Sequence, residues 1–502
     1  MKKPFLDPYY PDHVPNALVA QNRFVGAARE RKAPPSFKAA KALLPQPHWD
    51  GHASAIDCYW KSWELAFGNI RRPTRENGFV SNYIDTAFND HLFMWDSAFI
   101  LLFARYGSRA FDFQKTLDNF YAKQLPDGFI CRQIRESDGG DIFHRFDPSA
   151  TGPNVMPWTE WEYFKTFGDK ARLKKIFPAL AAFHQWMKAY RSWPGGGYWA
   201  TGWACGMDNQ PRIPKRYNQE WYHGKAVWAD TTLQQLFSAR LLAQMAAVLG
   251  REEAREFKRE EAELAAFVRA KLWDPKTAFY YDRLEDGKLS GVKSIGAFWA
   301  MLAGVLPASA KKRFVAHLEN PREFKRPHRV PSLSFEQPEY KTHGGYWLGG
   351  VWPNTNYMVL RGLSGLNEDA LAHEIAMNHH GHVTQMFEKT GTVFENYAPE
   401  YNGKGKPAKA DFVGWSGLGP IAVLFEYVFG LRADVPSGRL VWDLRLLEGH
   451  GVKGYPFAAK GLLDLSVAPR ASAKEKPQVK ASANMRLKLE IRWEGGKELR
   501  QL

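Results

Sequence analysis

Apolar residues recur at intervals of three and four along most of the chain between about residues 53 and 430. In "LQQLFSARLLAQM", for example, Leu233, Leu236, Phe237 and Leu241 fall on one face of a helix. Two kinds of helix alternate in this region. The pattern predicts amphipathic, charged helices of the first kind at residues 53–67, 109–123, 171–190, 250–271, 307–317 and 366–380.

The second kind of helix is more apolar, and each opens on an aromatic, polar or glycine-rich motif. These motifs are "FMWDSAF", "VMPWTEW", "AVWADTT", "SIGAFWA", "GGVWPNTNY" and "VGWSGLG". Alternation of exposed and buried helices is typical of two concentric layers. We therefore predict an all-α fold, an (α/α)6 toroid of six hairpins with the motifs around a cleft at one end. A helical array that does not close into a ring is the alternative.

The two ends of the chain differ from this middle region, which we predict to be a catalytic domain at residues 51–432. Residues 1–50 are rich in Pro, Lys and Arg and predict an N-terminal arm packed on the main body. In residues 433–502, segments such as "RLVWDLRLLEGHGVKGYPF" and "MRLKLEIRWEGG" alternate apolar and polar positions between turn residues. The sequence therefore predicts a small β-rich C-terminal segment.

Composition narrows the class of protein. Apolar residues are 45% of the 502, enough for a sizeable core, and no run of 18 apolar residues predicts a membrane span. The start "MKKPFLDPYYPDHVPNALV" lacks the continuous apolar stretch of a secretory signal, so we expect a cytoplasmic protein. The three cysteines, Cys58, Cys131 and Cys205, are too far apart to indicate a disulfide framework or a zinc site.

The net charge and the aromatic content suggest different kinds of binding partner. The 68 Lys and Arg against 53 Asp and Glu give a net charge of +15, which can attract nucleic acid or an anionic substrate. The excess lies in segments such as "RERKAPPSFKAAK", and no nucleic-acid-binding motif accompanies it. Aromatic residues are 14% of the chain, with 19 Trp, and their flat faces suit sugar rings. We expect a small carbohydrate as partner, and neither nucleic acid nor membrane; the oligomeric state stays open.

Two isolated acids stand before the third and sixth apolar helices: Asp208 in "GMDNQPR" and Glu395 in "GTVFENYAPEYNG". In a ring of six hairpins these two entries face each other across the cavity. A protonated and an ionised carboxyl on opposite sides of a sugar are the groups that glycoside cleavage needs. Burial among aromatic rings raises a carboxyl pKa, and hydrogen bonds lower it, so the two acids can take different roles. The alternative for Asp208 is an ordinary turn residue.

These motifs together carry a resemblance to a known family. "GMDNQPR", "GGVWPNTNY", "ENYAPE" and "FVGWSGLGP", with "FMWDSAF" and "PSLSFEQPEY", resemble glycoside hydrolase family 63 from about residue 76 to 430. The likeness is greatest to its bacterial mannosylglycerate and glucosylglycerate hydrolases and related α-glucosidases. The resemblance implies an (α/α)6 barrel and inverting hydrolysis of an α-glucoside or α-mannoside without a cofactor. It also implies that Asp208 is the general acid and Glu395 the general base.

Other residues of the same motifs are candidates for substrate binding. Trp95 would stack on the sugar, and Asp96 would accept its hydroxyl hydrogens; a core aromatic beside a helix-capping acid is the alternative. Arg212 would hold a substrate carboxylate or pair with an acid. The remaining candidates are Gln124, Asp127, Gly128, Asn209, Trp347, Trp352, Asn354, Tyr397 and Trp415.

The segment "AHEIAMNHHGH" contains four histidines, His373, His379, His380 and His382, and invites a metal site. They fall near the end of a predicted outer helix, away from the cleft. Stabilisation by the helix dipole is the favoured interpretation, and we predict no metal.

Two rival functions stay open at this point. A polysaccharide lyase on the same fold would use a Tyr/His pair on a uronate, and the paired acids argue against it. A non-catalytic carbohydrate-binding protein would explain the tryptophans but not the two opposed carboxylates.

Overall fold

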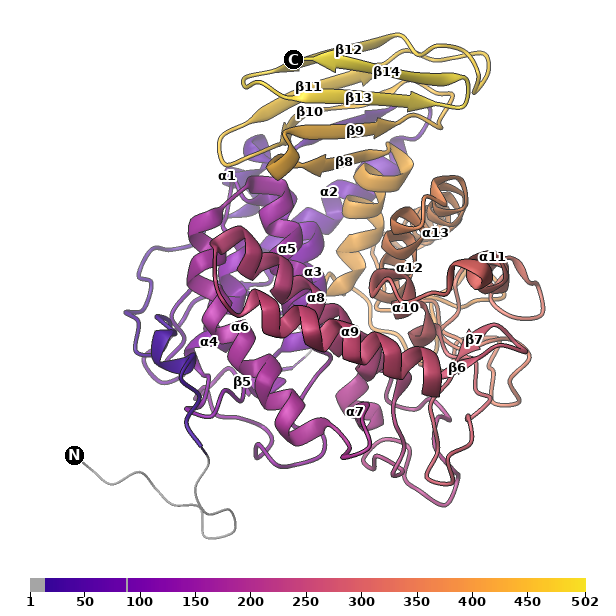
Figure 1. Ribbon diagram of the computed structural model, residues 1–502. Helices are drawn as coiled ribbons and strands as arrows, with labels where there is room; N and C mark the ends of the chain where they lie inside the picture. The colour runs from indigo at the N-terminus through magenta and orange to yellow at the C-terminus, as the bar shows by residue number, and fades with distance from the viewer. Residues whose placement is uncertain (1–13, 87–88) are drawn as a thin grey trace.

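The computed structural model describes residues 14–86 and 89–502, so the first 13 residues of the expected N-terminal arm lie outside the described residues. Helices form the body, and strands gather at one end of it (Figure 1). Helices occupy each segment predicted to be amphipathic: α2 (Ala53–Gly68), α4 (Thr116–Ala122), α6 (Lys170–Arg191), α9 (Ala254–Lys271), α11 (Lys311–Val315) and α13 (Asp369–Thr390).

The apolar helices alternate with these and form the core of the body. All eleven residues of the first of them, α3, are buried. Their bounds are α3 (Met94–Ala104), α5 (Met156–Phe167), α8 (Ala229–Leu249), α10 (Trp299–Leu302), α12 (Pro353–Gly365), η8 (Trp415–Leu418) and the π-helix η9 (Gly419–Val428). Contacts run from α3 through α5, α8, α10 and α12 to η8, which contacts α3 again. The body is therefore helical, with contacts that run around it.

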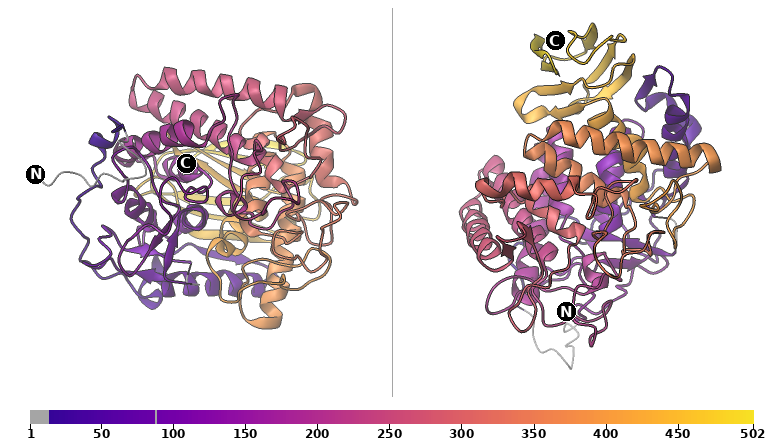
Figure 2. Two further views of the ribbon diagram at one scale, coloured as in Figure 1. Left: turned by 90° about the horizontal axis from the view of Figure 1, so that it is seen from below. Right: turned by 90° about the vertical axis from the view of Figure 1, so that its right-hand side faces the viewer.

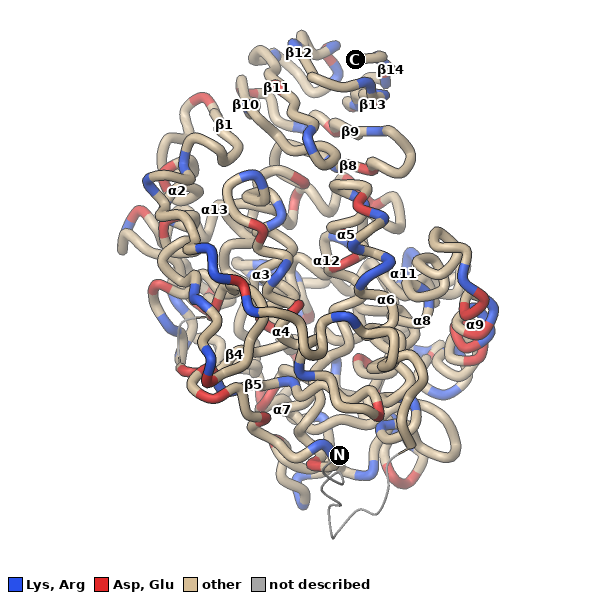
Figure 3. The backbone as a smooth tube through the Cα atoms, turned by 90° about the vertical axis from the view of Figure 1, so that its left-hand side faces the viewer, with Lys and Arg blue, Asp and Glu red and all other residues tan. Residues whose placement is uncertain are grey.

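The amphipathic helix α9 buries one face and leaves the other in contact with solvent. In α9 the buried residues Phe257, Glu260, Leu264 and Val268 follow one another at helical spacing, and the other charged residues of the helix lie on its exposed and partly exposed faces. Figure 3 shows acidic and basic residues mixed on α9 and scattered over the other elements. In this view the Lys and Arg residues are thus dispersed along the chain rather than gathered in one stripe.

Short elements complete the body. Three two-stranded sheets join β2 (Ile70–Arg71) with β3 (Tyr83–Ile84), β4 (His91–Phe93) with β5 (Gln133–Arg135), and β6 (Trp273–Asp274) with β7 (Phe279–Tyr280). Short helices are α1 (Phe37–Ala40), α7 (Gly202–Cys205), η1 (Val19–Gln21), η2 (Lys41–Leu43), η3 (Arg105–Gly107), η4 (Phe113–Lys115), η5 (Ile295–Phe298), η6 (Ala308–Ala310), η7 (Ala316–Glu319) and η10 (Val435–Ser437). Long loops gather at the end away from the larger sheets (Figure 2).

The strands of the C-terminal region form two four-stranded sheets. One has the order β14-β13-β9-β8, and the other has the order β1-β10-β11-β12. Their bounds are β8 (Leu431–Asp434), β9 (Arg439–Asp443), β10 (His450–Pro456), β11 (Leu462–Val467), β12 (Val479–Ala483), β13 (Lys488–Trp493) and β14 (Gly496–Gln501). The strand β1 (Gln46–Trp49) comes from the predicted arm and pairs antiparallel with β10. The arm therefore supplies an edge strand, a position that tolerates its Pro47.

The histidines of α13 lie elsewhere than expected. The helix runs on to Thr390, so His379 and His380 are in its interior and are buried. His379 Nδ1 lies 2.9 Å from Nε2 of His328, and His380 Nδ1 lies 3.1 Å from the carbonyl oxygen of Gly419. Burial lowers the pKa of His379 to about 3 and that of His380 to about 4. The helix-end interpretation is wrong for these two, because they are buried, neutral residues in the interior of the helix; the ring of His379 packs against Tyr397 and that of His380 against Trp49.

Two features are absent from the described residues. No helix there is both apolar and long enough to cross a membrane. Within the same ranges, no group of three or more His, Cys, Asp or Glu side chains is placed to hold a metal ion.

Candidate active site

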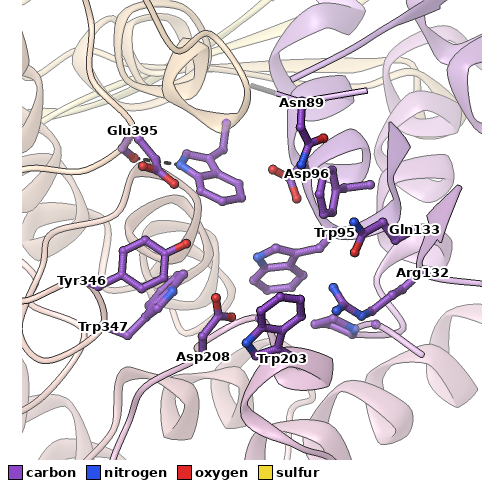
Figure 4. Close-up of a pocket in the computed structure, with 15 residues that line it drawn as sticks. Asn89, Trp95, Asp96, Arg132, Gln133, Trp203, Asp208, Tyr346, Trp347 and Glu395 are labelled. Carbon is purple, nitrogen blue, oxygen red and sulfur yellow. Dashed lines mark hydrogen bonds between the residues drawn. The ribbon is translucent and has the colours of Figure 1, made fainter. Parts of the chain in front are cut away.

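A cavity of about 260 Å³ opens at the loop end of the helical body, where α3 begins (Figure 4). Aromatic and polar side chains line it together. The lining residues are Asn89, Phe93, Trp95, Asp96, Arg132, Gln133, Gly152, Pro153, Trp203, Gly206, Asp208, Tyr346, Trp347, Glu395 and Trp415. Six candidates from the sequence are among them: Trp95, Asp96, Asp208, Trp347, Glu395 and Trp415.

Asp208 reaches the cavity because the short helix α7 ends sharply before it. Thr201 caps α7 by accepting a hydrogen bond from the amide of Ala204 at 3.1 Å. Gly206 then takes a left-handed conformation with φ +75°, and a Cβ there would lie 2.9 Å from Nε1 of Trp95. The glycine therefore makes room for the indole of Trp95, and the turn brings Asp208 to the cavity wall.

Glu395 lies in the loop between α13 and η8, and its backbone is fixed on both sides. Its amide donates to the carbonyl of Lys409 at 2.9 Å, and its own carbonyl accepts from Nε1 of Trp415 at 2.8 Å. Its carboxylate accepts a hydrogen bond from the amide of Lys409 at 3.3 Å. The side chain is 6% exposed, and Figure 4 shows it across the cavity from Asp208.

Burial moves both carboxyls toward neutral pH. The pKa of Asp208 is raised to about 7, first by desolvation; the guanidinium of Arg132 opposes the rise, and the charges of Glu220 and Glu395 add to it. The pKa of Glu395 is also raised to about 7 by desolvation, against the lowering effect of the Lys409 hydrogen bond. Each group can thus hold or release a proton near pH 7, which general acid and base chemistry requires.

A third carboxyl, Asp96, lies in the first turn of α3 and is 5% exposed. Desolvation, then the charge of Glu395, raises its pKa well above the usual range. Among the residues that the structure describes, its Oδ1 has no hydrogen-bond partner, and neither has Nε1 of Trp95. Buried polar atoms without partners at a cavity are suited to the hydroxyl groups of a ligand.

Sequence reasoning missed several residues of the lining, among them Arg132, Gln133, Trp203 and Tyr346. Gln133 begins β5, and Arg132 comes just before it, one residue after the "DGFI" segment. Tyr346 has φ +65°, a conformation rare for a residue with a side chain, within the glycine-rich "GGYWLGG". Two features of the sequence could have pointed to these residues: polar residues that follow a candidate motif, and an aromatic residue between glycines.

Three aromatic or polar candidates lie behind the wall rather than in it. Trp352 is fully buried and stacks on Trp347 with ring centroids 3.9 Å apart. Asn354 is buried in the first turn of α12, where its side chain accepts from the amide of Thr355. The hydroxyl of Tyr397 accepts from the amide of Phe394 at 3.2 Å. These side chains support the cavity wall and the Glu395 loop without lining the cavity.

The "KQLPDGFI" candidates are outside the lining because their polar groups are used within the core. Gln124 donates to the carbonyl oxygens of Gly128 and Ala179, and Asp127 accepts from Nε1 of Trp186 at 3.1 Å. Gly128 has φ +101°, and a Cβ there would be 2.5 Å from the Ala182 carbonyl oxygen. These residues hold a turn against α6.

The last two candidates hold the Asp208 loop. Asn209 donates to the carbonyl of Gly345 at 3.0 Å and accepts from the amide of Trp347 at 3.1 Å. Arg212 is 2% exposed and forms ion pairs with Asp230 and Asp282. The structure therefore supports pairing of Arg212 with acids rather than binding of a substrate carboxylate.

Two carboxyls on opposite walls of one aromatic cavity are an arrangement that glycoside hydrolases use. Residues 89–416 match the model of the mannosylglycerate hydrolase MGH1-like glycoside hydrolase domain. The chain belongs to this family of glycosidases, and the likeness to glycoside hydrolase family 63 is confirmed.

Two curated relatives illustrate the range of the likeness. The chain is 26% identical over 390 residues to the mannosylglycerate hydrolase of Thermus thermophilus, an alignment that covers 62% of this chain and 89% of the relative. It is 25% identical over 282 residues to a probable mannosyl-oligosaccharide glucosidase of Schizosaccharomyces pombe, covering 49% of this chain and 34% of that one.

Solved structures show the same fold. A mannosylglycerate hydrolase of family 63 from Thermus thermophilus, in complex with glucose, aligns with a TM-score of 0.58 at 22% identity, over 72% of this chain and 99% of that one. A family 78 rhamnosidase from Bacillus aligns with a TM-score of 0.64 at 17% identity, over 90% of this chain and 42% of the other.

Proposed function

We propose that this glycoside hydrolase inverts the anomeric centre of a small α-glucoside or α-mannoside, with Asp208 as general acid and Glu395 as general base. The observation that supports the proposal most strongly is the pair of carboxyls on opposite walls of one aromatic cavity, both with a pKa of about 7. We further propose that the helical body is an (α/α)6 toroid, supported by the contacts that run from α3 through the apolar helices back to α3.

In the proposed reaction the protonated carboxyl of Asp208 donates its proton to the glycosidic oxygen. Glu395 takes a proton from a water molecule, whose oxygen bonds to the anomeric carbon as the bond to the leaving group breaks. One water is consumed, and sugar and leaving group are released. Trp95 and Asp96 would hold the sugar that is cleaved off, through the ring face of the indole and the unpartnered Oδ1 of the carboxyl.

The cavity volume and lining bear on the substrate. A volume of about 260 Å³ is small beside the ~300–1,000 Å³ of sites for drug-sized ligands, and supports a single sugar ring as the enclosed part of the substrate. No histidine is among the described residues that line the cavity, so the Tyr/His pair of a lyase is missing from that lining. A glucose or mannose unit at the end of a small α-glycoside is therefore the proposed substrate.

The two pKa values predict a narrow, bell-shaped dependence of kcat/KM on pH. Activity requires Asp208 protonated and Glu395 ionised. Below about pH 7 Glu395 gains a proton, and above about pH 7 Asp208 loses one, so the rate falls on both sides of an optimum near pH 7. Rates measured from about pH 4 to 10 in buffers of constant ionic strength check this. A flat profile between about pH 5 and 9 would contradict the assigned roles.

The stereochemistry of the first product tests the mechanism itself. Single displacement by water on the face opposite the leaving group releases the β-anomer from an α-linked substrate. A proton NMR spectrum recorded early in a fast digest, before mutarotation, should therefore show the β-anomer. An initial α-anomer would mean a covalent intermediate, with Glu395 as nucleophile, and would overturn the inverting proposal.

A further inference from the structure

An aromatic surface continues from the Asp208 side of the cavity toward solvent. Trp203 lines the cavity, and its ring lies over that of Trp221 with centroids 4.1 Å apart. Phe143 lies 6.5 Å from both rings, and we call these three residues the aromatic ledge. Trp221 is 43% exposed and, within residues 14–86 and 89–502, is the only tryptophan with an exposed side chain. A ring is thus held open to solvent next to the catalytic cavity.

Backbone hydrogen bonds fix the ledge in place. The amide of Trp203 donates to the carbonyl of Glu220 at 3.1 Å, which ties the start of α7 to the segment that contains Trp221. The side chain of Asn218 accepts from the amides of both Glu220 and Trp221 at 2.9 Å. Because hydrogen bonds join the segment with Trp203 to the segment with Trp221, a sugar ring can stack on Trp221 without first having to order that surface.

Two hydrogen-bond donors on this side have no partner in the described part of the chain. Arg132 is only 9% exposed; its Nε donates to the carbonyl of Ser149 at 2.6 Å, but Nη2 is unpaired. Its guanidinium carbon lies 5.3 Å from the ring centroid of Trp203, whose Nε1 is also unpaired. Figure 4 shows Trp203 beside Asp208, on the side of the cavity away from Glu395. Buried donors of this kind are satisfied by a ligand with oxygen acceptors.

The charges on this side do not favour an anion. The carboxyls of Asp208 and Glu220 interact, since the charge of Glu220 raises the pKa of Asp208, and Arg132 is the one cation among the described residues of the cavity lining. With Asp208 protonated, as its role as general acid requires, the Glu220 carboxylate and the Arg132 guanidinium remain, so this side offers an anion no net positive charge. Both groups can form hydrogen bonds with neutral hydroxyl groups. A pyranose ring offers both an apolar face for Trp221 and hydroxyl groups for Arg132, Trp203 and Glu220.

We propose that the aromatic ledge is a subsite for a neutral sugar ring in the leaving group. The preferred substrates are then α-linked disaccharides or the ends of oligosaccharides, rather than α-glycosides of a small anion. This inference rests on the proposed function, because it is Asp208 as general acid that places the leaving group on the side of the ledge.

The test compares two leaving groups on the same sugar. Trp221→Ala should lower kcat/KM by about 10-fold on the best α-linked glucose or mannose disaccharide, because a stacked ring is lost. On the corresponding α-glycosyl fluoride, whose leaving group has no ring, the change should stay below about 2-fold. Trp60→Ala, in a half-buried tryptophan of the outer helix α2 that lies outside the lining, is the control and should change neither rate. An equal loss of kcat/KM on both substrates, or no loss on the disaccharide, would contradict the proposal that the aromatic ledge is a subsite.

A binding measurement separates the ledge from catalysis. In Asp208→Asn, which cannot turn over, the disaccharide should quench the fluorescence of the exposed Trp221, and the double variant with Trp221→Phe should lose that quenching. If the wild-type enzyme cleaves neither glycosides nor fluorides while the quenching persists, the proposed function is wrong, the ledge is not a leaving-group subsite, and only sugar binding at the ledge is supported. If a glycerate glycoside is cleaved more efficiently than every disaccharide, the function stands and the ledge fails.

Discussion

Asp208→Asn is expected to lower kcat on an α-linked disaccharide by about 10²–10⁴-fold, the range that general acid catalysis contributes. Asn has nearly the shape of Asp but no proton of suitable acidity, so the leaving oxygen must depart without protonation. Glu395→Gln should cause a loss of similar size, because the attacking water keeps its proton. KM should change far less than kcat in both variants.

A leaving group that needs no proton separates the two roles. Fluoride departs from an α-glycosyl fluoride with little help from an acid, so this substrate should restore much of the rate of Asp208→Asn and little of that of Glu395→Gln. Steady-state kinetics on both substrates measure the difference. Asp57→Asn, at an exposed position of α2, is the matched control and should leave both rates unchanged. Equal restoration of both variants would show that the roles are wrongly assigned.

Arg212→Met is expected to lower the free energy of unfolding by about 3–5 kcal/mol, the cost of leaving buried charges without their partner. Nε and Nη2 of Arg212 donate to Asp282 at 2.8 and 2.5 Å, and Nη2 donates to Asp230 at 2.9 Å. Asp230 and Asp282 are 0% and 3% exposed, so water cannot replace the guanidinium. Since domains are stable by about 5–15 kcal/mol, much of the stability would be lost.

Urea denaturation of the wild-type protein and of Arg212→Met measures this loss of stability. Arg216→Met, in the same loop, removes a cation from an exposed ion pair with Glu285 and should leave the denaturation midpoint unchanged. Adding Asp230→Asn and Asp282→Asn to Arg212→Met should restore part of the stability, because no buried charge of this network then lacks a partner. A destabilisation no larger than that of the Arg216 control would show that the buried network is not needed for the fold.

The helical order could be predicted because each amphipathic helix repeats apolar residues on one face and each inner helix opens on a recognisable motif. Pairing between strands that are far apart in the chain produces no comparable repeat or motif in the sequence. The strand β1 is four residues long, contains Pro47, and is defined by β10 at the other end of the chain, so its sequence predicts only an arm. The last predicted outer helix also ends too early, well before Thr390, which made the buried His379 and His380 look like helix-end residues.

The site could be predicted in part, because motif residues were named without knowing which way they face. Trp347 lines the cavity, whereas Trp352, in the same motif region, stacks behind it. Arg132, just before β5, and Trp203, in α7, both line the cavity and lie against each other, a placement that depends on tertiary structure. Residue type showed that carboxyls and aromatic rings gather near the loops, but orientation could not be read from periodicity where the chain is neither helix nor strand.

The pairing of β1 with β10 also sets an order of events during translation. Trp49 is opposite His450 in the sheet, at the other end of the chain. A ribosome that adds about 5–20 residues per second needs roughly 20–80 s to make the roughly 400 intervening residues. For that time β1 has no partner strand, while the helices between the two strands have already emerged and can pack. The pairing of β1 can form only after β10 has been synthesised, and a chain that stops before β10 keeps an unpaired strand edge that other chains can bind.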